Sequence, residues 1–267
     1  MDQLNVFYQQ ANPAFTFSGR GDRVHPESEG HLVWAYIYLR NQNLKGHDVS
    51  DFTIDAAAKL VTGATNCVIS DVSNNGDVIS FNYKANALPF PLDETRHNGD
   101  LRPASAAVPY IDFMQDLNQE VISVKNLSGK HYDLKIDGKV VGRFSADTLA
   151  TGVNMAAIKT TPQYLQAMEI LKKNEQRFST EKIMRDYYVQ VFNFARPNGI
   201  TVDNDPASWA KMRELKKTIG WIDNGLYERG SKPETRKGWQ DKMDNLVNEI
   251  YASNKPLKRK IELVKVD

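Results

Sequence analysis

Residues 68–83 read Val-Ile-Ser-Asp-Val-Ser-Asn-Asn-Gly-Asp-Val-Ile-Ser-Phe-Asn-Tyr, and they indicate the fold class of the middle of the chain. Apolar and polar side chains alternate over 78–83, a period of two that is typical of a strand with one buried face. Asn75-Gly76 is a dipeptide favoured in tight hairpin turns. We therefore predict an antiparallel hairpin with strands over 68–70 and 78–83.

The same signals recur further along the chain. Residues 121–124 and 132–136 are strand-like and are joined by a turn that contains Gly129, which predicts a second hairpin. Asp137-Gly138 then turns the chain into another strand over 140–144. Short strands at this spacing predict an antiparallel sheet or a small sandwich, and we assign residues 48–150 to a β-rich antiparallel domain.

After residue 150 the pattern becomes helical. We assign residues 151–267 to a helical region in which a final strand over 261–266 returns to the sheet. Methionine and aromatic stripes at helical spacing mark buried faces, so we interpret them as core. Helix starts are predicted at four places from proline, threonine and aspartate signals: Thr161-Pro162, Thr180, Asp205-Pro206 and Pro233.

Composition narrows the function classes. The 267 residues suffice for one to three domains, and 41% hydrophobic with 25% charged residues is ordinary globular material. A net charge of +1 argues against nucleic acid as a partner. No run of eighteen apolar residues occurs, so no membrane span is predicted. The single cysteine, Cys67, is interpreted as a core thiol, and the histidines lack metal-ligand spacing, so we expect no metal and no cofactor.

The candidate chemistry lies near the amino terminus, in Asp22-Arg23-Val24-His25-Pro26. A serine hydroxyl needs a base to remove its proton, and histidine suits that task at neutral pH. A carboxylate on the other ring nitrogen holds the imidazole in the right tautomer and stabilises its cation. Pro26 disfavours a helical His25, so a helix over 27–41 should begin just after the histidine.

The order of a short strand at 15–17, a glycine loop, Asp22-x-x-His25-Pro26 and an apolar helix resembles the last sequence block of the SGNH (GDSL-type) hydrolases. The resemblance implies that His25 is the general base, that Asp22 orients it, and that His31 is an ordinary helix residue. It also implies that residues 1–47 are the terminal piece of a three-layer α/β domain. With the β-rich and helical regions, this gives an α+β chain overall.

That family also needs a Gly-Asp-Ser nucleophile block and oxyanion donors, which this chain lacks. Gly-Asp occurs at Gly21, Gly76 and Gly99 but is never followed by serine. Three explanations stay open: a carboxy-terminal fragment of a longer enzyme, half of a split gene completed by a partner chain, or a remnant without chemistry. The expected partner is accordingly a missing hydrolase segment or a second copy of the chain.

The resemblance implies an ester hydrolase, with acylated carbohydrate as one substrate class and an extracellular or periplasmic location. The alternative function is a non-catalytic module that binds carbohydrate or protein. It rests on aromatic residues that could line a groove of the β-rich region: Phe81, Tyr83, Phe90, Tyr110 and Tyr132.

Overall fold

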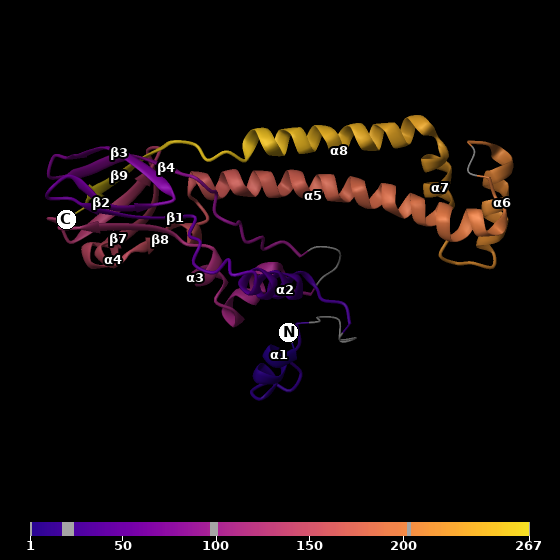
Figure 1. The fold of residues 1–267 in the computed structure, drawn as a ribbon, viewed down its shortest axis with the longest axis horizontal. Coiled ribbons are helices and arrows are strands. Elements are labelled where there is room, and N and C mark those ends of the chain that lie inside the picture. Colours follow the sequence, from indigo (N-terminus) through magenta and orange to yellow (C-terminus); the bar gives the residue numbers. More distant parts are fainter. Residues whose placement is uncertain (1, 18–23, 97–100, 202–203, 267) are drawn as a thin grey trace. The chain divides into compact units, whose positions relative to one another are not determined.

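The computed structural model describes residues 2–17, 24–96, 101–201 and 204–266 (Figure 1). By compactness the chain divides into two units, residues 1–168 with 255–267, and residues 169–254. The fold is α+β. The predicted partition into 1–47, 48–150 and 151–267 describes modules of sequence pattern and stays a prediction.

The first unit contains two sheets (Figure 1). The four-stranded sheet has the order β2-β1-β5-β8, with bounds Leu60–Thr65, Ser50–Asp55, Glu120–Lys125 and Val153–Asn154. The five-stranded sheet has the order β3-β4-β9-β6-β7, with bounds Cys67–Asn74, Val78–Ala85, Arg259–Lys265, His131–Ile136 and Lys139–Ser145. The predicted terminal strand is thus present as β9, antiparallel to both of its neighbours.

The predicted hairpin over 68–83 is confirmed as β3 and β4. Gly76 has a φ of 98°, a left-handed conformation that glycine adopts without steric cost, and Asn75 Oδ1 accepts a hydrogen bond from Val78 N at 2.8 Å. The β6–β7 hairpin turns at Asp137 and Gly138, which both have positive φ values, 50° and 79°, as a two-residue type I′ turn requires.

The second predicted hairpin, between 121–124 and 132–136, is wrong. Strand β5 runs parallel to β1, where Ser50 faces Glu120, and antiparallel to β8. Strand β6 belongs to the other sheet, between β7 and β9. Alternation specifies which face of a strand is buried, but it does not specify the neighbouring strand. The intervening residues, with Asn126 at a φ of 58°, carry the chain from one sheet to the other.

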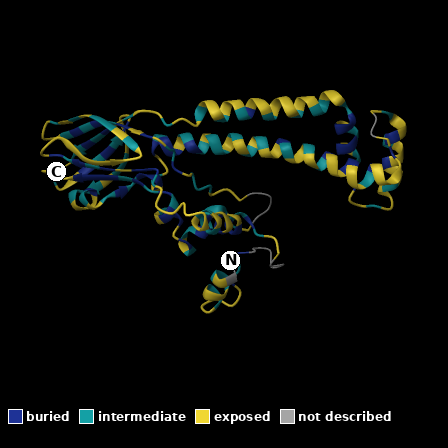
Figure 2. Cartoon of the chain, in the orientation of Figure 1, coloured by how far each residue is buried: buried dark blue, intermediate teal, exposed yellow. Residues whose placement is uncertain are grey.

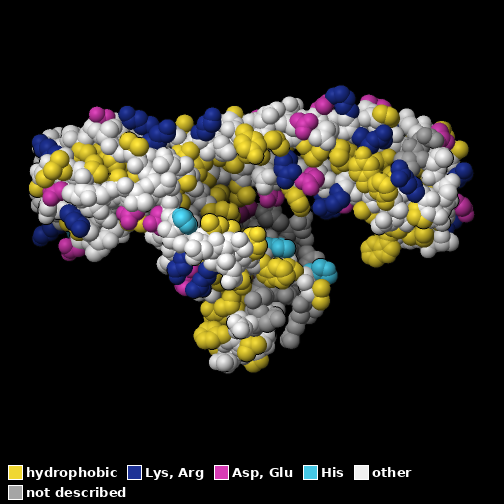
Figure 3. Space-filling model, viewed as in Figure 1, with side chains coloured by type: hydrophobic (Ala, Val, Ile, Leu, Met, Phe, Trp, Pro, Cys, Tyr) yellow, Lys and Arg dark blue, Asp and Glu magenta, His cyan; other side chains and the backbone are white. Residues whose placement is uncertain are grey.

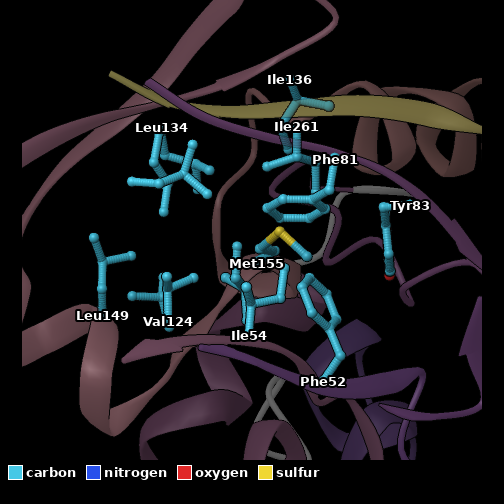
Figure 4. Close-up of a cluster of buried hydrophobic side chains, with 14 of the residues drawn as sticks. Phe52, Ile54, Phe81, Tyr83, Val124, Leu134, Ile136, Leu149, Met155 and Ile261 are labelled. Carbon is cyan, nitrogen blue, oxygen red and sulfur yellow. The ribbon is translucent and has the colours of Figure 1, made fainter. Parts of the chain in front are cut away.

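The two sheets enclose one hydrophobic core (Figure 4). Strand β4 shows the principle, since Ile79, Phe81 and Tyr83 are at most 2% exposed while the residues between them are not buried (Figure 2). The facing sheet contributes Phe52 and Ile54 from β1. Phe52 packs on Phe81 and Tyr83 with ring centroids 5.7 and 5.1 Å apart.

A second apolar cluster joins the amino-terminal helices to residues 92–117. It contains α1 (Asp2–Gln9), α2 (Ser28–Asn41), η1 (Ala104–Tyr110) and α3 (Phe113–Leu117). The strand predicted over 15–17 is absent; Phe15 and Phe17 instead fill this cluster in edge-to-face contact with Tyr110. The described part of residues 1–47 therefore packs on residues 92–117 through this cluster.

Helix α4 (Ala146–Thr151), strand β8, the short helix η2 (Met155–Ala157) and one long helix follow strand β7. Helix α4 is capped by Ser145, and η2 follows β8. Helix α5 then runs from Pro162 to Val189 without a break. The separate helix predicted from Thr180 is wrong, because the Thr180 hydroxyl donates to Gln176 O at 3.0 Å and is satisfied within one continuous helix.

The second unit continues from α5. A π-helical turn η3 (Gln190–Ala195) and η4 (Arg196–Asn198) lead to α6 (Pro206–Lys216), α7 (Asn224–Ser231) and α8 (Pro233–Ser253). Asp205 caps α6 through its carboxylate, and α8 begins at Pro233, both as predicted. Aromatic and aliphatic stripes form the core of this unit, which includes Tyr187, Met212, Ile222 and Tyr227.

A buried polar group lies between the sheet and the first turn of α5. Glu120 is 0% exposed; its Oε1 accepts hydrogen bonds from Tyr83 Oη at 2.7 Å and from Gln163 Nε2 at 3.1 Å. Ser50 Oγ lies 2.7 Å from Tyr83 Oη. Burial raises the pKa of Glu120 to about 7, although the hydrogen bonds from Tyr83 and Gln163 and the charge of Arg259 oppose the rise.

Replacing Glu120 by glutamine should flatten the pH dependence of stability. The carboxyl titrates near 4.5 when unfolded and near 7 when folded, so the folded state binds more protons between these values. The free energy of unfolding of the wild type should therefore fall as pH rises through this window, by about 3 kcal/mol, and level off above it. Glu120→Gln should lose this fall.

Urea unfolding at pH 5 and pH 8 measures the difference. Glu169→Gln is the matched control, because that carboxylate lies on the surface of α5, 65% exposed, and should change neither value. Parallel pH profiles for the wild type and Glu120→Gln would contradict the assignment.

Candidate functional site

The predicted dyad lies at the entrance to α2. His25 is exposed and precedes Pro26, and the helix begins at Ser28 with Glu27 in an extended conformation at its N-cap. The helix start predicted from Pro26 is thus confirmed. Asp22 lies outside the described residues. The structure therefore places the histidine at the surface, on the loop before the helix.

Two carboxylates directly after His25 are buried, and sequence reasoning did not identify them as special. Glu27 is 3% exposed and Glu29 is 0% exposed. Glu27 Oε2 accepts a hydrogen bond from Leu101 N at 2.8 Å, and Glu29 forms an ion pair with Arg102. Acidic residues in a first helical turn predicted only a favourable interaction with the helix dipole. Their burial depends on residues far along the chain.

The surroundings of the Glu29 carboxyl disfavour its charged form. Burial raises its pKa to about 6, the positive charge of Arg102 opposes the rise, and the neighbouring negative charge of Glu27 adds to it. Arg102 is 38% exposed, so the ion pair has one solvated and one buried partner. Removing only the arginine would leave a buried charge without compensation, which is the costly way to break such a pair.

Close backbone packing completes the site. Gly30 follows the two acids in α2, and a Cβ at this position would collide with the backbone carbonyl of Phe17 and lie 2.8 Å from Pro26 Cβ. Only glycine lets the helix approach the chain segment that leads towards His25 this closely. His31, one residue later, is exposed on α2.

Other features of the described chain supply no competing chemistry. Two open grooves flank α1, and they are lined by residues such as Leu4, Phe7 and Tyr110, without His25. Hydrophobic side chains gather on this part of the surface (Figure 3). No group of three or more potential metal ligands occurs within the described ranges. None of the helices described has the length and apolar character to cross a membrane.

Cys67 lies at the start of β3, half-buried against the main core. Burial raises the pKa of its thiol to about 11, and the negative charge of Asp51 adds to the rise. The thiolate is the nucleophilic form of cysteine, so this side chain is unsuited to attack at neutral pH.

Two comparisons relate the chain to known proteins. Residues 168–255 match the family model described as the diltiazem deacetylase C-terminal helical domain. The second unit resembles that domain. The match covers almost the same residues as the compact unit 169–254, so the family model and the packing delimit the same helical domain.

A solved structure described as "BT4096 a gut microbial diltiazem-metabolizing enzyme" is similar over the whole chain, with 36% sequence identity and a TM-score of 0.94. The similarity covers 100% of this chain and 60% of that enzyme, so the chain spans about three-fifths of its relative. No curated protein matches the chain.

These findings overturn the resemblance to the SGNH (GDSL-type) hydrolases. Both the family model and the solved structure point to diltiazem-metabolizing proteins instead. The motif that carried the resemblance, Asp22-x-x-His25-Pro26, contains only three specified residues including the proline before the helix, and so short a pattern arises on unrelated backbones. What the fold does bear out is the position of the histidine before a helix.

Gly30→Ala should destabilise the chain by about 1–3 kcal/mol, because the added methyl group overpacks the contact between α2 and Phe17. Gly238→Ala is a matched control, since that helical glycine in α8 has open space around it and alanine is the better helix former. Urea unfolding of both variants tests this. Equal stabilities for the two alanine variants would show that α2 can shift away from Phe17.

Proposed function

We propose that this chain is part of an ester hydrolase in which His25 is the general base. The observation that carries the proposal is the placement of His25 on the exposed loop before α2, just ahead of two buried carboxylates that anchor the helix start. The similarity to a diltiazem-metabolizing enzyme, together with the match to a deacetylase domain, supports hydrolysis of an acetyl ester.

The residues of this chain would act in both halves of the reaction. His25 removes the proton of a serine hydroxyl as its oxygen attacks the ester carbonyl carbon, and the imidazolium then protonates the departing alcohol. In the second half His25 deprotonates a water molecule, which attacks the acyl-enzyme and releases the acid. Asp22 would orient the imidazole and stabilise its cation.

The nucleophile is proposed to lie outside these 267 residues. The solved enzyme is longer than the region that matches this chain, which covers 60% of it. The serine and the oxyanion donors would come from polypeptide that corresponds to the remainder of that enzyme, whether on the same gene product or on a partner. The chain alone should then be inactive.

The substrate class follows from the relatives. The matched domain is named for diltiazem deacetylase, so an acetyl ester of a small organic molecule is the substrate that we propose. An acylated carbohydrate stays a prediction, because it depended on a resemblance that the comparisons replace.

The structure removes part of the basis of the binding-module alternative. Phe81, Tyr83 and Tyr132 are at most 2% exposed and belong to the core between the sheets, so these three aromatic residues are structural. Phe90 packs against Phe113 with ring centroids 5.5 Å apart but is 48% exposed. Tyr110 belongs to the amino-terminal apolar cluster and lines the two grooves beside α1.

His25→Ala in the complete gene product should lower kcat for an aryl acetate by about 10²–10⁴-fold, because the general base is lost. His31→Ala is the matched control: it removes an exposed imidazole from the same region and should leave kcat unchanged. The measurement is release of the phenol at saturating substrate.

Near-normal turnover by His25→Ala would refute the role of this histidine. Equal losses in both histidine variants would also refute it, since they would indicate a general disturbance of α2. Turnover by the purified 267-residue chain, absent from its His25→Ala form, would refute only the external nucleophile.

A further inference from the structure

Arg102 contacts the chain on both sides of the segment that carries His25. Its Nη2 donates a hydrogen bond to Thr16 O at 2.9 Å, before that segment, and forms an ion pair with Glu29, after it. One guanidinium group therefore joins the beginning and the end of the segment. Both contacts are made by the same nitrogen, Nη2, and the guanidinium plane fixes the directions of its N–H groups, which the freely rotating ammonium of a lysine does not.

The residue next to Arg102 makes a similar contact. Leu101 N donates to Glu27 Oε2 at 2.8 Å, so residues 101 and 102 bind the N-cap acid and the first-turn acid of α2. Gly30 adds a third contact, where its backbone packs on Phe17 O. Three independent contacts thus fix the start of α2, three residues after His25.

The chemistry of these contacts is costly for a helix that only needs to pack. The buried carboxylate of Glu29 loses its hydration, and an ion pair with a half-exposed guanidinium offsets only part of that cost, so apolar side chains of similar volume would contribute more to stability. Glu29 Oε2 has no hydrogen-bond donor among the described residues. The ion pair does fix the relative orientation of its two side chains, since a charge-assisted contact holds its partners in a defined geometry.

We propose that Arg102 and Glu29 are positioning residues for His25, whose ion pair sets the direction in which the imidazole faces the substrate. The inference builds on the proposed function of His25. Neither residue is assigned contact with the substrate: they act through the backbone at Thr16 and at the first turn of α2.

Kinetics of the complete gene product test the role in turnover. Arg102→Gln and Glu29→Gln should each lower kcat for an aryl acetate by about 10–100-fold with KM nearly unchanged, because a displaced catalytic group loses near-attack geometry. Arg102→Lys keeps the positive charge and should recover part of kcat. Arg143→Gln is the control, since it breaks an exposed ion pair with Asp133 on the β6–β7 hairpin.

A readout that is independent of activity separates this inference from the proposed function. The imidazole resonances of His25 in the 267-residue chain, assigned by comparison with His25→Ala, should move in Arg102→Gln and Glu29→Gln. The resonances of His131, on β6, should stay in place. Glu29→Gln preserves shape and serves as the second variant if Arg102→Gln fails to fold.

The outcomes are distinct. Unmoved His25 resonances in both variants, or an unchanged kcat in both where His25→Ala is inactive, would overturn the positioning role. Moved resonances together with an active His25→Ala enzyme would refute the catalytic role of His25 while supporting the ion pair as the group that orients it. A large change in KM without a change in kcat would also overturn the inference, because it would indicate substrate binding.

Discussion

Strand β9 is the constraint on which the first unit depends. Residues 259–265 enter the middle of the five-stranded sheet, between β4 and β6, and Ile261 and Leu263 are fully buried there. Without β9, two long strands would present open edges. Its register is reinforced by Arg259, which donates to Asp137 and to Gln166, the latter on α5. The chain must therefore return to this sheet after residues 169–254. The helical unit is thus an insertion in the sequence of the first unit.

Two of the buried carboxylates of the first unit, Glu120 and Glu29, each join segments that are distant in sequence. Glu120 connects β5 with Tyr83 and Gln163, and Glu29 connects α2 with Arg102. In both cases desolvation raises the pKa of the carboxyl. Above its pKa such a buried carboxyl is charged, and the charge lowers the stability of the folded state. Few other groups in the protein could take the place of its hydrogen-bond and ion-pair partners. The first unit thus combines a conventional apolar core with a few polar contacts that define how its segments meet.

The site follows from this arrangement. His25 owes its exposure to Pro26, which keeps it out of the helix, and its fixed surroundings to contacts made by Leu101, Arg102 and Gly30. In the proposed function, His25 meets a nucleophile from other polypeptide, and a base that is held rigidly keeps the orientation that this encounter needs.

Features encoded within a few residues were predictable from the sequence alone. The β3–β4 turn at Asn75-Gly76, the caps at Ser145 and Asp205 and the helix start at Pro233 all follow from local dihedral preferences. The parallel pairing of β5 with β1, the unbroken α5 and the ion pair between Arg102 and Glu29 were decided only by tertiary structure. Dihedral preference and periodicity specify conformation and the buried face, whereas the choice of partner depends on the free energy of bringing distant segments together, which no local pattern records.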